Sequence, residues 1–173
     1  EELWLGGNAL AELPLATSQL ASLTTLDLDG NRLTSLDCIC RLPTLTALYA
    51  NDNQLAMLPD DLGHLRALRT LRLSGNLLGS DGGPAQCCVQ LQSLGGLRSL
   101  WLARNGLKAV PDALCKLGAL EECDLSDNTI TALPATLLGD LKGLQELNLA
   151  GNALEYPPIS VASQGVRAMR EWQ

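Results

Sequence analysis

The sequence contains no phenylalanine, only 3% aromatic residues and a single histidine, His64. Aromatic side chains supply much of the bulk of most protein cores, so this core must be built from another residue. A lone histidine, with no cysteine or carboxylate at ligand spacing, predicts neither a zinc site nor a serine-histidine-aspartate triad. We therefore expect no enzymatic activity in this chain, no metal, no cofactor and no small-molecule substrate.

Basic residues are also scarce. Twelve lysines and arginines stand against 19 acidic residues, which gives a net charge of -7 and a pI of about 4.6. An acidic chain repels phosphate groups, which argues against a nucleic-acid or anionic-membrane partner. No apolar run approaches the roughly 18 residues of a membrane-spanning helix, and no phosphate-binding glycine motif is present.

Six cysteines are few for a disulfide scaffold of this length, and none clusters at the chain ends. We interpret them as reduced, small core residues. The sequence also contains no N-x-[ST] glycosylation site, which argues against secretion as well. We therefore expect a cytoplasmic protein.

Leucine is abundant, and it recurs in a fixed rhythm. The pattern L-x-x-L-x-L-x-x-N-x-L occurs seven times at spacings of 22 to 29 residues, with Ala50 and Cys123 each replacing one leucine. In L-x-L both leucines face one side of a strand, and one copy cannot bury them alone. Stacked copies predict an α/β solenoid with a curved parallel sheet on its concave side and short helical or extended convex segments. The motif asparagines, which we expect to turn inward and bond backbone groups of their own and neighbouring coils, are Asn8, Asn31, Asn53, Asn76, Asn105, Asn128 and Asn152.

This motif resembles that of leucine-rich-repeat proteins. Most coils continue as L-x-x-L-P-x-x-L-x-x-L, as in residues 107–120, which resembles the intracellular Ras-suppressor and adenylate-cyclase type over nearly the whole chain. The resemblance implies a scaffold that binds another protein in intracellular signalling, for example a small GTPase or a kinase. The alternative is the substrate-targeting arm of a larger enzyme (a ubiquitin ligase, kinase or GTPase-containing protein) whose catalytic domain lies outside these residues.

The coil that contains residues 77–96 is longer than its neighbours by six residues. It resembles the ribonuclease-inhibitor type of repeat, which implies a helix on the outer face. Pro84 would lie near the start of that helix, with Cys88 and Leu91 facing inward. A looped insertion is the alternative.

The seven repeats occupy residues 1–154, and the first is truncated because its opening leucine would precede Glu1. We therefore expect the chain to be a fragment of a longer protein. Residues 155–173 resemble the closing segment of Ras-type repeat domains, in which a double proline leads to a helix that caps the last coil. The residues that match this form are Pro157, Pro158, Val161, Gly165, Ala168, Met169 and Trp172.

Because the inward positions hold leucine, binding residues are expected at the outward strand positions, which stack as columns about 4.8 Å apart. The column between the two strand leucines contains three of the five aromatic residues, and Trp, Tyr and Arg dominate binding hot spots. That column reads Trp4, Asp27, Tyr49, Arg72, Trp101, Asp124 and Asn148. The predicted partner-binding residues are Trp4, Tyr49, Arg69, Arg72, Arg98, Trp101, Arg104, Glu121 and Asp124.

A purely structural interpretation is that Arg98 pairs with Glu121 and Arg104 with Asp127 on neighbouring strands. It leaves Arg69 beside the like charge of Arg98, and it leaves the Trp101 side chain exposed. Those two features favour a partner that brings a carboxylate and an apolar group.

Overall fold

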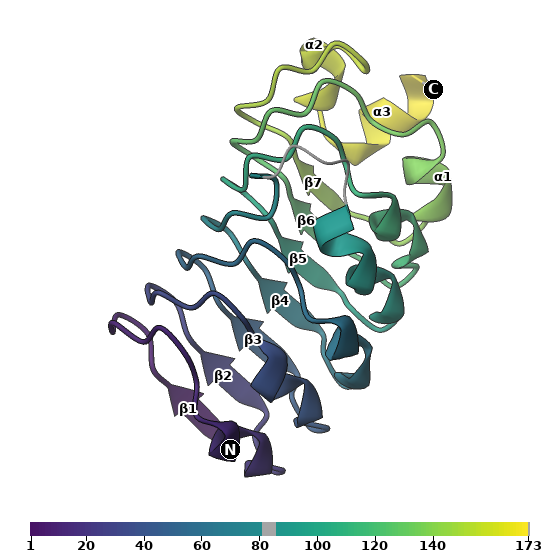
Figure 1. Cartoon of the computed structure of the whole chain (residues 1–173). Helices are drawn as coiled ribbons and strands as arrows, with labels where there is room; N and C mark the ends of the chain where they lie inside the picture. Colours follow the sequence, from purple (N-terminus) through teal and green to yellow (C-terminus); the bar gives the residue numbers. More distant parts are fainter. Residues whose placement is uncertain (81–85, 173) are drawn as a thin grey trace.

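A computed structural model describes residues 1–80 and 86–172. Seven three-residue strands form one parallel sheet in chain order (Figure 1). They are β1 (Glu2–Trp4), β2 (Thr25–Asp27), β3 (Ala47–Tyr49), β4 (Thr70–Arg72), β5 (Ser99–Trp101), β6 (Glu122–Asp124) and β7 (Glu146–Asn148). The pairing is in register, with Leu26 beside Leu48 and Leu48 beside Leu71, so one inward row of side chains runs along the sheet. The predicted solenoid is confirmed.

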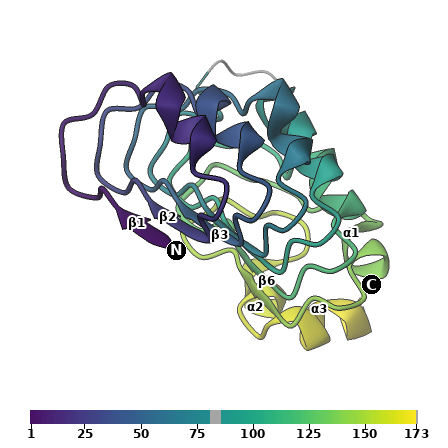
Figure 2. The ribbon, with the colours of Figure 1, turned by 90° about the horizontal axis from the view of Figure 1, so that it is seen from below.

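Short helical segments return the chain on the outer side. They are η1 (Leu15–Gln19), η2 (Asp37–Arg41), η3 (Asp60–His64), η4 (Gln86–Ser93), η5 (Asp112–Lys116) and α1 (Leu137–Asp140). Pro14, Pro59 and Pro111 immediately precede η1, η3 and η5, where a fixed φ suits a chain that leaves the strand. The strands line the inner side of the curve and the helical segments line its outer side (Figure 2). Within the described ranges, no helix is long and apolar enough to cross a membrane.

The leucines form one continuous hydrophobic core between the sheet and the outer segments. The two substitutes, Ala50 and Cys123, are buried in the same rows as the leucines they replace. Burial, with a smaller contribution from the Asp124 charge, raises the pKa of the Cys123 thiol to about 12. This position therefore holds a neutral side chain.

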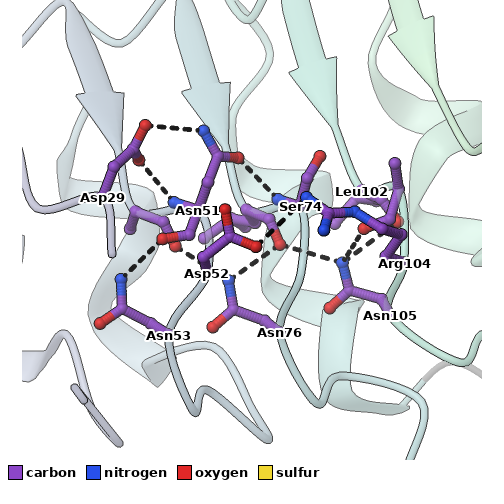
Figure 3. A network of polar contacts seen from close by, with 12 residues as sticks. Asp29, Asn51, Asp52, Asn53, Ser74, Asn76, Leu102, Arg104 and Asn105 are labelled. Atoms are coloured by element: carbon purple, nitrogen blue, oxygen red, sulfur yellow. Dashed lines mark hydrogen bonds and ion pairs between the residues drawn. The ribbon is translucent and has the colours of Figure 1, made fainter. Parts of the chain in front are cut away.

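The motif asparagines tie successive coils together, as predicted. The side-chain oxygen of Asn53 accepts a hydrogen bond from the Leu33 backbone at 2.9 Å, and its nitrogen donates to Leu28 of the same preceding coil at 2.9 Å. Asn76 and Asn105 lie side by side with Asn53 in this ladder (Figure 3). Each satisfies polar backbone groups that are buried away from water.

The long coil contains a helix on the outer face. Residues Gln86–Ser93 form the 3-10 helix η4, and Cys88 and Leu91 are fully buried beneath it. The helical alternative is therefore confirmed over these residues, in a tighter form than an α-helix. The expected position of Pro84 lies outside the described residues.

Two short helices, α2 (Ile159–Ala162) and α3 (Val166–Trp172), cover the last coil, where a single helix was expected. Gly165 joins them with a φ of 90°, a conformation that strongly favours glycine. The Met169 side chain is fully buried in the core. Trp172 lies outside the core: it is 40% exposed, and its ring centroid lies 4.8 Å from that of Tyr156.

Candidate binding face on the inner side of the sheet

The strand register brings the predicted aromatic column together. Tyr49 on β3 lies beside Arg72 on β4, which in turn lies beside Trp101 on β5. The Arg72 guanidinium lies over both rings, with its central carbon 4.9 Å from the Tyr49 centroid and 3.9 Å from the Trp101 centroid. Trp4 reaches past Asp27, so that its ring centroid is 6.4 Å from that of Tyr49. The column is thus a continuous stack.

This stack corrects one expectation about Trp101. The Trp101 side chain is half-buried rather than exposed, because Arg72 covers one side of its indole. Each cation-π contact contributes about 0.5 to 1 kcal/mol at partly exposed sites, so the two contacts together hold the Arg72 side chain in place. An indole fixed in this way loses little conformational freedom when a partner binds.

Two other arginines of the predicted site have partners within the chain. Arg98 donates to Glu121 at 2.5 Å, which is the cross-strand pair that the sequence predicts. Arg69 turns toward its own coil and donates to the Leu68 carbonyl oxygen at 3.0 Å. Of these two predicted binding residues, Arg98 is therefore neutralised by Glu121, and Arg69 is directed onto the backbone.

Arg104 pairs with a residue that the sequence interpretation did not assign to it. Its guanidinium lies 3.2 Å from the carboxylate of Asp52, which belongs to the coil two repeats earlier (Figure 3). The expected pair with Asp127 of the adjacent coil is not formed. Gly75 occupies the intervening coil, and a Cβ there would lie 2.2 Å from an Asp52 carboxylate oxygen. The missing side chain leaves the space through which Asp52 reaches Arg104.

The residue before each motif asparagine has a positive φ in every coil. Glycine, which adopts this conformation without strain, occupies four of these positions: Gly7, Gly30, Gly75 and Gly151. The other three hold Asp52, Arg104 and Asp127, with φ between 51° and 53°. A side chain there costs about 1 kcal/mol or more, so three charged groups occupy positions where glycine is relaxed.

A shallow groove of about 320 Å³ lies among these three residues. Its floor is made of small buried side chains, Ser74, Ala103 and Ser126. Trp101 and Asp124, which precede Ala103 and Ser126 by two residues, form one side of the groove. The positive-φ residues Asp52, Arg104 and Asp127 form the other side. A smaller hollow of about 150 Å³ adjoins it and is lined by Trp101 together with Glu122, Asp124 and Glu146.

The list of predicted partner-binding residues leaves out two outward columns beside this groove. The first strand residue, such as Ser99 or Glu122, also faces outward, and these two are joined by a hydrogen bond of 3.0 Å. A second column lies two residues after the last residue of each strand. It contains Asp29, whose carboxylate accepts hydrogen bonds from the backbone and side chain of Asn51. The signal was available, because both residues that flank an inward leucine must point away from the core.

With these columns included, the sheet side carries most of the charge of the chain. Its ten carboxylates stand against the four guanidiniums of Arg69, Arg72, Arg98 and Arg104, a balance of -6 out of the total of -7. The carboxylates are Glu1, Glu2, Asp27, Asp29, Asp52, Glu121, Glu122, Asp124, Asp127 and Glu146. The inner face is therefore acidic overall.

The remaining titratable candidates lie elsewhere. His64 lies on η3, on the outer side, 3.9 Å from the Asp61 carboxylate and exposed to solvent. In the part of the chain that the structure describes, no three His, Cys, Asp or Glu side chains are arranged to hold a metal ion.

Comparison with known proteins gives a consistent result. A family model described as "Leucine rich repeat" matches residues 1–55 and 95–154. Podocan-like protein 1 of Homo sapiens is 42% identical over 175 residues, which covers 98% of this chain and 33% of that protein.

Two solved structures match the fold. The LRR protein LIC12759 of Leptospira interrogans superimposes with a TM-score of 0.76 at 30% identity, over 85% of this chain and 36% of that one. The LRR ectodomain of the receptor kinase GASSHO1/SCHENGEN3 of Arabidopsis thaliana, in complex with CASPARIAN STRIP INTEGRITY FACTOR 2, gives 0.71 at 29% identity, over 88% and 18%. The chain spans about a third or less of each of these proteins.

Proposed function

Because this chain belongs to the leucine-rich-repeat family, whose domains generally serve as protein-protein interaction modules, we propose that it binds a partner protein on its inner, concave face. The energetic centre of that contact is Trp101, with Arg72 and Arg98 beside it. Trp4, Tyr49, Arg69, Arg104, Glu121 and Asp124 complete the contact surface. The chain acts by binding and performs no catalysis of its own.

The Tyr49–Arg72–Trp101 stack carries this proposal. Tryptophan and arginine are the residues most often found at the energetic centres of interfaces. Here they occupy the middle strands of the sheet and are fixed before any partner arrives, so binding sacrifices little side-chain entropy. The GASSHO1/SCHENGEN3 ectodomain, which was solved in complex with CASPARIAN STRIP INTEGRITY FACTOR 2, supports a binding role for a domain of this architecture.

Replacing Trp101 with alanine tests the proposal. Central aromatic anchors commonly cost about 2 kcal/mol or more when truncated, so a partner recovered from cell lysate should bind Trp101→Ala more than about tenfold more weakly. The half-buried ring contributes about 1 kcal/mol or less to folding, so the denaturation midpoint should change little. Thr24→Ala, near the other end of the sheet, and Lys116→Ala, on the outer helix η5, serve as controls. Unchanged binding by Trp101→Ala, together with loss of binding in the Lys116 variant, would refute the concave assignment.

We further propose an intracellular signalling context, with a small GTPase or a kinase as the partner. The support is chemical: Cys38, Cys40, Cys115 and Cys123 are free thiols, as a reducing compartment maintains them. Fluorescence microscopy of the tagged full-length protein tests the cytoplasmic location, and a secreted product would overturn it.

A second candidate function is that of a targeting arm for a larger enzyme. It is favoured by one of the matched structures, because the GASSHO1/SCHENGEN3 ectodomain belongs to a membrane receptor kinase, and this chain spans 18% of that ectodomain chain. In that case the concave face recruits the substrate, and catalysis belongs to another part of the polypeptide. The two functions differ in what happens to the bound protein: an enzyme of which this is the arm modifies it, whereas a scaffold releases it unchanged.

A further inference from the structure

The charges around the groove are not balanced within the chain. Arg104 is committed to Asp52 at 3.2 Å. Among the described residues Asp124 and Asp127 have no ion-pair partner, although Asp124 accepts a hydrogen bond from the Ser126 backbone at 2.9 Å. The end of the groove at β6 therefore presents two carboxylates whose charge is uncompensated.

The Asp127 carboxylate is held in position by the neighbouring coil. A Cβ on Gly151 would lie 2.1 Å from its oxygen, so the side chain rests over that glycine. Asp127 also retains a positive φ of 52°, which glycine would adopt without strain. The charge is kept at the edge of the groove at a conformational cost that folding alone does not require.

Trp101 contributes an aromatic surface at the same end. Arg72 covers one side of the indole, and the side turned toward β6 borders both the groove and the smaller hollow. An aromatic face attracts a cation, and neighbouring carboxylates strengthen that attraction. Arg72 lies between two aromatic rings, whereas this second side of Trp101 combines one ring with the carboxylates of Asp124 and Asp127.

A buried hydroxyl supplies an independent indication of a ligand. Ser74 lines the groove, is only 7% exposed, and within residues 1–80 and 86–172 its Oγ has no hydrogen-bond partner. Buried polar atoms are normally paired, and each exception calls for an explanation. Because Ser74 lies two coils before Asp124 and Asp127, a second donor on the same bound segment, such as a backbone N–H, would satisfy this oxygen.

We infer that the groove receives a basic side chain, lysine or arginine, from an extended segment of the partner protein, and that this side chain is seated against Trp101 and paired with Asp124 and Asp127. The inference rests on the proposed function and specifies its partner. It also reverses the chemistry expected from the sequence, where the arginines pointed to a carboxylate on the partner. The structure has already paired two of those arginines internally, so the charge that remains unmet is negative.

The test measures binding of two labelled peptides by fluorescence anisotropy at low ionic strength. In one peptide lysine alternates with glycine and serine, and in the other glutamate replaces each lysine. The lysine peptide should bind, and its affinity should fall as salt is added, because salt screens exposed charges. The glutamate peptide should not bind.

Two double variants locate the contact. Asp124→Asn with Asp127→Asn removes both charges from the groove while retaining the hydrogen-bond acceptor for Ser126, and asparagine tolerates a positive φ. Asp112→Asn with Asp140→Asn removes the same charge from exposed positions on the outer side, on η5 and α1. The groove variant should bind the lysine peptide at least about fivefold more weakly than the outer-face variant, which should resemble the parent.

Every outcome is decisive. The inference is overturned if the lysine peptide fails to bind, if both double variants lose affinity equally, or if the glutamate peptide is preferred. Trp101→Ala separates such a failure from failure of the proposed function. If a glutamate peptide binds and is lost in Trp101→Ala, the concave face still binds partners and only the charge assignment is wrong.

Discussion

The first and last coils carry the same motif but differ in how well they are covered. In the first coil Leu3 and Leu5 are only half-buried, and Leu15 on η1 is 84% exposed. The equivalent leucines of the last coil, Leu147 and Leu149, are buried. The last coil lies beneath α2 and α3, whereas nothing described in the structure lies beyond the first (Figure 1). The motif therefore supplies a coil with apolar side chains, and a neighbouring element completes their burial.

Removal of residues 157–173 should make the last coil resemble the first. Met169 and Val166 would be lost from the core, and a large buried side chain contributes about 1.5 to 3 kcal/mol. We expect the free energy of unfolding to fall by several kcal/mol in urea denaturation. Arg167→Ala in the same segment removes only an exposed ion pair with Glu171 and should cost less than about 1 kcal/mol. An unchanged midpoint in the deletion would show that the cap does not cover the core.

The asparagine ladder offers the same comparison at a polar position. Asn105 is buried and bonds two coils, donating to the Leu73 carbonyl oxygen at 2.9 Å and accepting from the Leu78 backbone. Asn8 is exposed and bonds only within its own coil, to Leu5 and Gly6. We expect Asn105→Ala to cost about 1 to 3 kcal/mol, because it leaves buried backbone groups unpaired, and Asn8→Ala to cost less than about 1 kcal/mol. Thermal denaturation of the two variants measures the difference, and equal losses would contradict it.

The smallest expected effect on stability is the pH dependence that the Cys123 thiol causes. Burial raises the pKa of Cys123 from 9.0 to about 12, so between these values the folded state retains a proton that the unfolded state releases. Stability from this group is complete below pH 9.0 and is lost as the pH rises toward 12. At pH 10 the loss is on the order of 1 kcal/mol.

Cys123→Ala should therefore lose less stability than the parent between pH 8 and about pH 10 in urea titrations. Leu3→Cys in a Cys123→Ala background places a thiol at the equivalent, half-buried position of the first coil. That thiol should react with an alkylating agent faster than Cys123 does in the parent. Equal reactivity would mean that the two coils are equally covered.

The inward half of this molecule could be read from its sequence, because leucine and asparagine positions obey one repeating geometry. The strand register, the ladder, and the burial of Cys88 and Leu91 all follow from it. The contacts on the outward side depend on the conformations of long side chains, and the spacing of residues in the sequence does not determine these conformations. Arg104 forms its ion pair with Asp52 and not with Asp127, because Gly75 has no side chain at the intervening position. Trp101 proved half-buried because Arg72 stacks on it.

Part of this was nevertheless available in the sequence. The residue before each motif asparagine is glycine in four coils and charged in three, which marks those three coils as unusual. An aspartate in one coil followed by glycine in the next occurs at Asp52 with Gly75 and at Asp127 with Gly151, and in both cases the carboxylate leans over the glycine. A glycine after such an aspartate therefore indicates that the aspartate can reach a charged residue two coils away, as Asp52 reaches Arg104.

The asparagine ladder also has a polarity. The side-chain oxygen of Asn53 accepts from Leu33, that of Asn76 from Leu55, and that of Asn128 from Leu107, always a backbone group of the coil before. The preceding coil therefore keeps an unsatisfied N–H until the following coil is in place. A ribosome delivers coils in that same order, from the N-terminus onward. Vectorial synthesis suits this protein, since each coil that emerges completes the one already made.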